Sequence, residues 1–299
     1  MRELQISITV AGLSRIYGND LAGVIELARI ADDVGIDQVA LPDHVAIGPR
    51  TDRYPYGPFP LPADEPWLEP LTTLAAMAAV TKRVRLATGI LIAPLRSPAL
   101  LAKSAATLDV LSGGRLDLGV GVGWQEEEYE ASAVPFGERW RRMDDTLRAC
   151  RALWRDAPAS FASETVAFEG IYSVPQPVQP GGVPLWFGIA PTERGAQRMA
   201  EFGSGWMPME AGPDDLREGI RRIHAALASA GRDSSTFGVR AHVPVARSGK
   251  RPDLAATLAG LPALAEAGAT VASIALAAFA GSVAEVRPFL ESVGRGLRS

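Results

Sequence analysis

Residues 84–124, VRLATGILIAPLRSPALLAKSAATLDVLSGGRLDLGVGVGW, decide the fold. The apolar segments 84–93 and 115–122 are typical of buried strands, and a helical pattern over 98–111 separates them. A strand, a helix and a second strand predict parallel pairing through a right-handed crossover. Both strands end in glycines: Gly89 in the first, and Gly119, Gly121 and Gly123 in the second. We interpret these strand ends as the place where a flat ligand, and hence a redox cofactor, lies close to the main chain.

The same alternation of strand and helix continues along the chain. Further strands are predicted at 4–10, 38–41, 185–189, 205–209, 237–246 and 271–277, and helices at 20–34, 71–80, 137–154, 193–202, 214–230, 253–267 and 283–293. Eight such units with no break in composition predict a single-domain (β/α)8 TIM barrel over residues 1–299, with an inserted loop after the second strand. A doubly wound open sheet is the alternative. It needs fewer units, and no G-x-G-x-x-G motif follows the first strand.

Composition narrows the function classes. The 299 residues carry a net charge of −4 with no basic tract, which argues against a nucleic-acid partner. The single cysteine, Cys150, excludes an intrachain disulfide and fits a reducing compartment; we expect it to pack on the core face of helix 137–154. No signal-peptide pattern and no apolar run long enough for a membrane span occur, so we expect a cytoplasmic protein without a membrane partner.

One histidine is the candidate catalytic group. His44 directly follows the second strand, in Pro42-Asp43-His44, where a barrel places its active site. An imidazole there exchanges a proton near neutral pH. The alternative is that Asp43 and His44 only organise the start of the loop. His242 alternates within a strand and is a second candidate, and the spacing of the three histidines predicts no metal site.

Two loops are candidates for ligand contact. Gly188-Ile189-Ala190 opens the turn before helix 193–202, where free backbone N–H groups form an anion site; a plain connecting turn is the alternative. The proline-rich loop 48–66 carries aromatic side chains that suit an apolar substrate: Tyr54, Tyr56 and Phe59. A disordered loop or a dimer contact is the alternative for this segment.

Several motifs resemble the bacterial luciferase-like superfamily, and most closely its actinobacterial branch of coenzyme F420-dependent oxidoreductases. They are Pro42-Asp43-His44, Thr88-Gly89-Ile90, Ala105-Ala106-Thr107-Leu108-Asp109, Leu111-Ser112-Gly113-Gly114-Arg115 and Gly119-Val120-Gly121-Val122-Gly123-Trp124. The resemblance extends along nearly the whole chain. It implies a (β/α)8 barrel with a flavin or deazaflavin at its C-terminal mouth.

The resemblance also assigns roles to residues. It implies a non-prolyl cis peptide at Gly89-Ile90 beneath the ring, with Thr88 and Gly121 near the ring or its side chain, and His44 as the active-site histidine. Ile189-Ala190 stands where many relatives have Gly-Gly at the cofactor phosphate. Trp124 stands where some deazaflavin dehydrogenases carry an acidic residue, which argues against a sugar phosphate as substrate.

Three functions follow as hypotheses. The favoured one is hydride transfer between F420 and a small apolar substrate, with His44 handling the proton and Trp124 and the aromatic loop shaping the cavity. The second is a monooxygenase that uses reduced FMN and a separate flavin reductase. The third is a non-catalytic binding protein, favoured by Ile189-Ala190. The expected partners are a small-molecule substrate, a flavin or F420 reductase, and a second copy in a homodimer.

Overall fold

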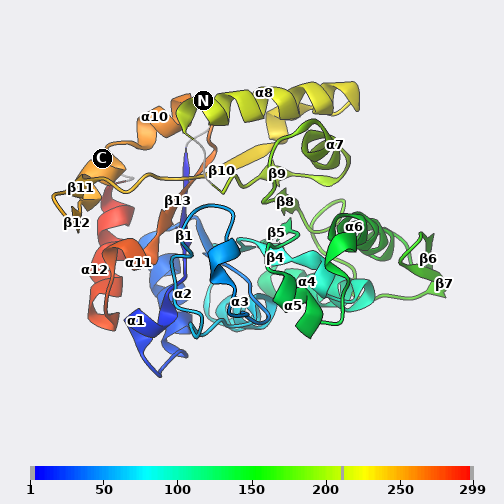
Figure 1. Ribbon diagram of the computed structural model, residues 1–299, viewed down its shortest axis with the longest axis horizontal. Coiled ribbons are helices and arrows are strands. Elements are labelled where there is room, and N and C mark those ends of the chain that lie inside the picture. Colours follow the sequence, from blue (N-terminus) through cyan, green and yellow to red (C-terminus); the bar gives the residue numbers. More distant parts are fainter. Residues whose placement is uncertain (1–3, 210–211, 297–299) are drawn as a thin grey trace.

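The computed structural model describes residues 4–209 and 212–296. In this part of the chain one parallel sheet runs in the order β3-β2-β1-β13-β10-β9-β8-β5-β4, and β3 also pairs with β5. That additional pairing closes the sheet, so the predicted barrel is confirmed (Figure 1). Its strands are β1 (Gln5–Thr9), β2 (Gln38–Leu41), β3 (Arg85–Thr88), β4 (Leu91–Ile92), β5 (Leu116–Gly121), β8 (Leu185–Phe187), β9 (Gly205–Trp206), β10 (Gly238–His242) and β13 (Val271–Ala275).

Helices surround the barrel and connect its strands. The longer ones are α2 (Gly23–Val34), α3 (Pro70–Val80), α4 (Pro98–Ser112), α6 (Arg139–Arg155), α7 (Glu193–Phe202), α8 (Pro213–Ser229) and α12 (Val283–Gly296). Shorter ones are α1 (Leu13–Tyr17), α5 (Glu126–Ala131), α9 (Leu254–Leu258), α10 (Leu261–Glu266) and α11 (Leu276–Phe279). Proline opens α3, α4 and α8, where its missing N–H costs no intrahelical bond. In the described ranges no helix combines the length and the apolar character that a membrane crossing requires.

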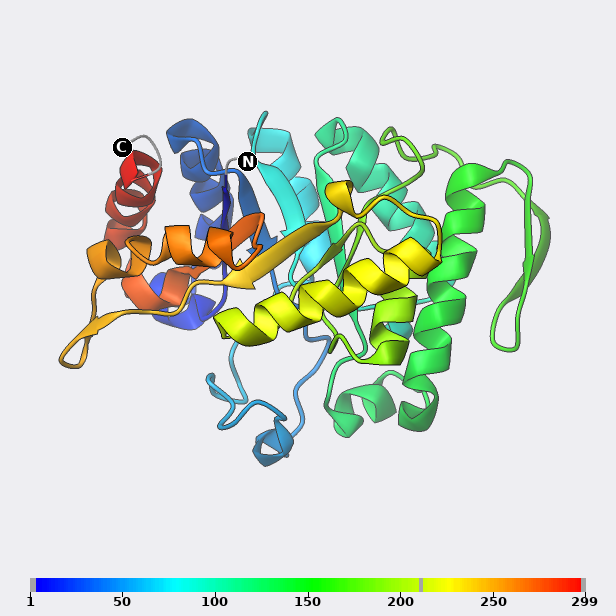
Figure 2. The same cartoon turned by 90° about the horizontal axis from the view of Figure 1, so that it is seen from above.

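Two antiparallel hairpins project from opposite sides of the barrel (Figures 1 and 2). One consists of β6 (Ala159–Ala162) and β7 (Ala167–Ile171). The other consists of β11 (Arg247–Ser248) and β12 (Arg251–Pro252), which the sequence pattern did not indicate.

Three predicted boundaries were wrong. Strand 84–93 is interrupted after Thr88, so that β3 and β4 are separate strands. Helix 253–267 is split into α9 and α10 around Gly260, because glycine weakens a helix interior. Helix α2 starts at Gly23, three residues later than predicted, with Ala22 at its N-cap.

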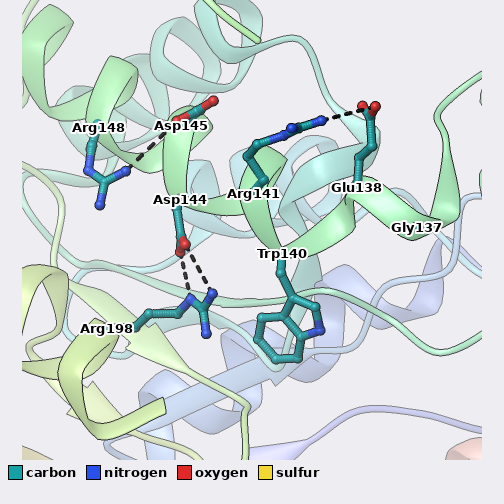
Figure 3. Close-up of a pocket in the computed structure, with 8 residues that line it drawn as sticks. All are labelled: Gly137, Glu138, Trp140, Arg141, Asp144, Asp145, Arg148 and Arg198. Atoms are coloured by element: carbon teal, nitrogen blue, oxygen red, sulfur yellow. Dashed lines mark hydrogen bonds and ion pairs between the residues drawn. The ribbon is translucent and has the colours of Figure 1, made fainter. Parts of the chain in front are cut away.

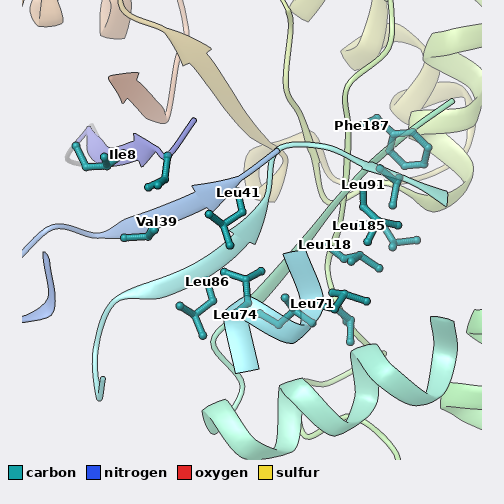
Figure 4. Close-up of a cluster of buried hydrophobic side chains, with 14 of the residues drawn as sticks. Ile8, Val39, Leu41, Leu71, Leu74, Leu86, Leu91, Leu118, Leu185 and Phe187 are labelled. Carbon is teal, nitrogen blue, oxygen red and sulfur yellow. The ribbon is translucent and has the colours of Figure 1, made fainter. Parts of the chain in front are cut away.

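The hydrophobic core lies between the outside of the barrel and the helices. Alternate strand residues such as Ile8, Val39, Leu86 and Leu118 are fully buried there, and α3 adds side chains such as Leu74 (Figure 4). Each buried aliphatic side chain contributes about 1.5–3 kcal/mol. This alternation fixes the register of every strand, because a slip by one residue would bring the apolar set inside the barrel.

The inside of the barrel combines polar groups with a small apolar cluster that contains Trp186 and Met207. Gln38 Nε2 donates to Asp117 Oδ2 at 2.8 Å, and Arg85 forms an ion pair with the same carboxylate at 2.6 Å. Trp186 fills the space beside Gly205 and Gly238, where an added Cβ atom would lie 2.2 Å from the indole. Side chains therefore fill the lower barrel, and any ligand must bind at the mouth.

Candidate active site

The floor of the mouth is a bulge in the chain between β3 and β4. The Gly89–Ile90 peptide is cis. Gly89 N–H donates to the Leu41 carbonyl at 2.7 Å, and the Thr88 hydroxyl donates to the Gly119 carbonyl at 2.7 Å. These bonds tie the bulge to both neighbouring strands, so the floor is a fixed feature of the barrel.

Glycines on two neighbouring strands make room for the Ile90 side chain. A Cβ atom added to Gly121 would lie 2.8 Å from Ile90 Cδ1, and one added to Gly188 would lie 2.5 Å from Ile90 Cγ2. Both distances are below normal carbon–carbon contact. Glycine at these two positions is therefore explained by packing within the protein, because it leaves room for Ile90. The contact predicted for Gly121 with the ring or its side chain, and the anion site predicted at Gly188, remain predictions.

His44 is held at the mouth by a buried carboxylate. His44 Nδ1 lies 3.1 Å from Glu128 Oε2, and the Val45 N–H donates to Glu128 Oε1 at 2.6 Å. Glu128, on the short helix α5, is completely buried. The Glu128 carboxylate accepts a backbone N–H, and an ionised carboxylate can only accept hydrogen bonds. We therefore place the proton of the imidazole on Nδ1, which donates it to Glu128. Nε2 is then the nitrogen that remains free to accept a proton.

Asp43 has a structural role beside this pair. Its carboxylate accepts the Ile92 N–H at 2.8 Å and forms a two-pronged ion pair with Arg96 at 2.6 and 3.0 Å. Both side chains are largely buried, and together they tie the end of β2 to the segment after the bulge. For Asp43, these contacts agree with the alternative that the motif organises the start of the loop. His44 differs, because its second ring nitrogen takes no part in these contacts.

Aromatic rings surround His44. Its ring centroid lies 4.7 Å from that of Trp67, 6.0 Å from Phe59 and 6.1 Å from Trp124. Tyr54 contacts Trp124 at 5.3 Å, and further contacts join Tyr54 to Phe59 and to Tyr56. Of the four residues predicted for the substrate pocket, the structure places Phe59 and Trp124 against His44, Tyr54 beside both of them, and Tyr56 further out against Tyr54. We call these residues and Trp67 the aromatic roof.

The loop that carries the roof is tethered at both ends. Gln125 exchanges two hydrogen bonds with the backbone of Gly48, at 2.7 and 3.0 Å. Glu65 is buried and accepts from both the backbone and the hydroxyl of Ser14. In Figure 2 the loop projects from the same end of the barrel as α5. The loop thus covers the mouth from fixed anchor points.

Sequence reasoning missed one charged group beneath the roof. Arg240 on β10 is 2% exposed, and its guanidinium donates to the hydroxyls of Ser7, Thr9 and Ser273 at 3.1, 2.7 and 2.8 Å. Burial lowers the pKa of Arg240 to about 10, so it stays charged at neutral pH. The period of two along β10 was the available signal, because it places Arg240 on the same face as His242.

His242 lies one step closer to the mouth. It pairs in register with Ser273 at the C-terminal end of β10 and is accessible to solvent. Desolvation and then the charge of Arg240 lower the pKa of His242 to about 4. Its position at the C-terminal end of β10, two residues beyond Arg240 on the same face, places His242 on the mouth side of Arg240.

The turn before α7 keeps its backbone open. Thr192 caps the helix by accepting the Gly195 N–H at 3.2 Å, and the first N–H groups of a helix have no intrahelical acceptor. The Ile189 side chain is buried in the core, so it does not cover the solvent side of the turn. Ala190 is exposed. The turn can thus accept an anion despite lacking the two glycines.

A large surface hollow of about 420 Å³ lies elsewhere, between α6 and α7 (Figure 3). Its charges are paired: Asp144 binds Arg198 at 2.8 Å, and Glu138 binds Arg141 at 3.0 Å. Arg198 also stacks over Trp140 at 4.8 Å. The hollow contains none of the predicted site residues.

Two motif residues have structural roles. The Arg115 guanidinium donates to the carbonyls of Ala78, Thr81 and Val84, and so caps the end of α3. Asp109 accepts from the backbone of Gln179 at 3.1 Å and anchors the segment before β8.

A model of the luciferase-like monooxygenase family matches residues 4–291. The chain belongs to this family. It is therefore an oxidoreductase of the luciferase-like type, and the resemblance noted in its motifs is confirmed. An uncharacterized protein of Mycobacterium tuberculosis is 37% identical over 212 residues, which are 69% of this chain and 74% of that protein.

Solved structures of low sequence identity share the fold of this luciferase-like protein. The monooxygenase RslO1 from Streptomyces bottropensis has a TM-score of 0.80 at 20% identity and covers 99% of both chains. An F420-dependent secondary alcohol dehydrogenase, solved with an F420–acetone adduct, has a TM-score of 0.79 at 18% identity and covers 99% of this chain and 100% of that one.

The mouth of this luciferase-like barrel fits a flat cofactor. Its floor is the Gly89–Ile90 bulge, and the α7 turn offers N–H donors. In the roof above, the Trp67 indole N–H is buried without a partner among the described residues, and burying such a donor is costly unless a ligand accepts from it. The residues present therefore suit a flat ring on the floor and a further polar acceptor beneath the roof.

Proposed function

We propose that this protein is an F420-dependent oxidoreductase that moves a hydride to or from a small, mainly apolar organic substrate. The observation that carries the proposal is His44, which Glu128 orients at 3.1 Å beneath the aromatic roof. A hydride transfer to or from an oxygen-bearing carbon needs one proton donor or acceptor and a dry cavity. The F420-dependent secondary alcohol dehydrogenase of the same fold supports this choice.

A bound deazaflavin would supply the hydride chemistry at C5 of its ring. Thr88, Gly89, Ile90 and Gly121 would form the floor under the ring, and the turn Gly188-Ile189-Ala190 would receive its phosphate. His44 would exchange the proton at Nε2, because its Nδ1 is engaged by Glu128. The roof would exclude water and select an apolar substrate.

The unpartnered Trp67 N–H refines the substrate class. Trp67 and His44 are ring neighbours at 4.7 Å, so a single oxygen atom on the substrate could contact both groups. We expect an alcohol, aldehyde or ketone with an apolar body. Charged substrates such as sugar phosphates would find no cation in the roof.

A flavin-dependent monooxygenase is the second candidate, favoured by the shared fold of RslO1. Parallel fluorescence titrations with F420 and with FMN, each oxidised and reduced, separate the two. Tighter binding of F420 supports the proposal, whereas tight binding of FMN alone overturns it. Binding of neither would favour a non-catalytic barrel.

Variants then test His44 itself. His44→Ala should bind the cofactor normally and lose about 100-fold or more in turnover, the usual worth of a general acid or base. His224→Ala, on helix α8, is the matched control and should retain activity. Unchanged turnover in His44→Ala would remove this residue from the reaction.

A further inference from the structure

Arg240 is a buried cation with an incomplete set of partners. Its Nε and one terminal nitrogen donate to three hydroxyls, and these hydroxyls bring no negative charge. Among residues 4–209 and 212–296 no carboxylate forms an ion pair with Arg240. The nearest acidic influence, Asp117, is already bound to Arg85 at 2.6 Å.

Such an arrangement is unfavourable in the protein alone. Buried charges normally have a charged partner, because removing an ion from water costs far more than neutral hydrogen bonds return. The hydroxyls of Ser7, Thr9 and Ser273 come from β1 and β13, and they hold the guanidinium in one orientation. This is a positioned positive charge that lacks its counter-charge.

The remaining terminal nitrogen of Arg240 reaches the floor of the mouth. It lies 3.3 Å from the position that a Cβ atom on Gly89 would take, and it donates to no acceptor among the described residues. A side chain at residue 89 would crowd this nitrogen, whereas glycine leaves the space beside it open. A flat group lying on the Gly89–Ile90 bulge would therefore touch the guanidinium.

We infer that Arg240 binds the electron-rich N–C=O edge of the cofactor ring and favours its reduced, anionic form. This inference rests on the proposed binding of a flavin-type ring at the bulge. A ring that receives a hydride, which is one proton and two electrons, gains one negative charge unless a second proton follows. Arg240 supplies the counter-charge for that gain, and the ring supplies the counter-charge that Arg240 lacks.

The test compares affinities for the two redox states. The dissociation constants of oxidised and reduced F420, and of oxidised and dithionite-reduced FMN, are measured anaerobically for the wild type and for Arg240→Gln. We expect the preference for the reduced form to fall at least tenfold in Arg240→Gln, which for a two-electron couple equals a fall of about 30 mV in the potential of the bound cofactor. Arg240→Lys keeps the charge and should retain most of the preference.

Two further variants serve as a control and as a replacement for Arg240→Gln. Arg115→Gln removes a guanidinium that binds carbonyls and the Thr81 hydroxyl around the far end of α3, so it should lower stability and leave the preference unchanged. If Arg240→Gln does not fold, Arg240→Met takes its place, because apolar replacements of buried charges are usually tolerated.

The outcomes separate the two proposals. A wild type that binds neither cofactor overturns the proposed function and this inference together. A wild type that binds a cofactor, with an equal redox preference in the Arg240 variants, leaves the proposed function standing and overturns the inference. Equal preference with weaker substrate binding would assign Arg240 to an anionic substrate instead.

Discussion

Substituting Gly188 by alanine tests whether Ile90 shapes the floor of the site. Gly188 does not adopt the left-handed backbone, so alanine adds no conformational strain there. Its new Cβ atom would lie 2.5 Å from Ile90 Cγ2. Normal contact between carbon atoms is about 3.5–4.0 Å, so the Ile90 side chain must move by roughly 1 Å.

The size of the effect follows from this overlap. Forcing an extra methyl group into a packed site costs about 1–3 kcal/mol, and we expect Gly188→Ala to lower the free energy of unfolding by that amount. Ile90→Ala in the same chain removes the clashing Cγ atoms, and the Ile90 Cβ atom that remains lies 3.4 Å from the new methyl group. The double variant should therefore be more stable than the sum of the single effects predicts, by about 1–2 kcal/mol.

Urea unfolding followed by tryptophan fluorescence gives the four free energies of the double-mutant cycle. Gly137→Ala is the matched control, because a Cβ atom there meets nothing within 4 Å and its φ is also not left-handed. It should change stability by less than about 0.5 kcal/mol. A neutral Gly188→Ala, or strictly additive effects of the two substitutions, would refute the role given to Ile90.

Three other predictions concern individual polar side chains. Burial raises the pKa of the Cys150 thiol to about 12, so a thiol reagent should modify it only after unfolding in guanidinium chloride; rapid reaction of the native protein would contradict this. Desolvation and then Arg240 lower the pKa of His242 from 6.5 to about 4, so an NMR titration should find a neutral ring throughout most of that range. Because the unfolded chain takes up this proton first, stability should fall as the pH drops from 6.5 toward 4, and His242→Asn should reduce the slope. Asp43→Asn breaks a buried pair with Arg96 and should cost about 3 kcal/mol in urea unfolding; a loss well below about 1 kcal/mol would show that the pair adds little.

The barrel could be predicted from the sequence because the residue pattern that encodes each strand and helix is local and is repeated along the chain. In β1 the residues Ile6 and Ile8 face the helices while Ser7 and Thr9 face the interior, and this alternation is visible in the letters alone. Helix ends were similarly readable where glycine or proline stands, as at Gly35 after α2. Such signals act within a few residues, so no knowledge of distant contacts is required.

The bulge was indicated only by the family resemblance, which implied the cis peptide at Gly89–Ile90, and the residue pattern itself does not show it. Ile90, Leu91 and Ile92 continue the apolar run of β3, so hydrophobicity gives no sign that the strand is interrupted. Only Gly89 marks the break. Its effect depends on contacts with Leu41 and Gly119, which are distant in the sequence.

Glu128 illustrates a second limit. It is the last of three consecutive glutamates on α5, a pattern that ordinarily indicates an exposed, charged surface. Its burial results from contacts with His44 and Val45, more than eighty residues earlier in the chain. The sequence thus indicated the catalytic candidate but not the residue that orients it, because orientation is set by tertiary contact.

Floor and roof of the mouth have opposite chemistry, and this division constrains what can bind between them. The floor presents the cation Arg240 beside Gly89, with His242 at the side, whereas the roof presents Trp124 and its aromatic neighbours. A wholly apolar ligand would leave Arg240 without a counter-charge, and a wholly polar one would be poorly placed against the roof. Under the two proposals, two stacked ligands would satisfy both surfaces: a ring with an electron-rich edge below, and an apolar substrate above. His44 lies under the roof with Nε2 free, where a proton would be needed between the two.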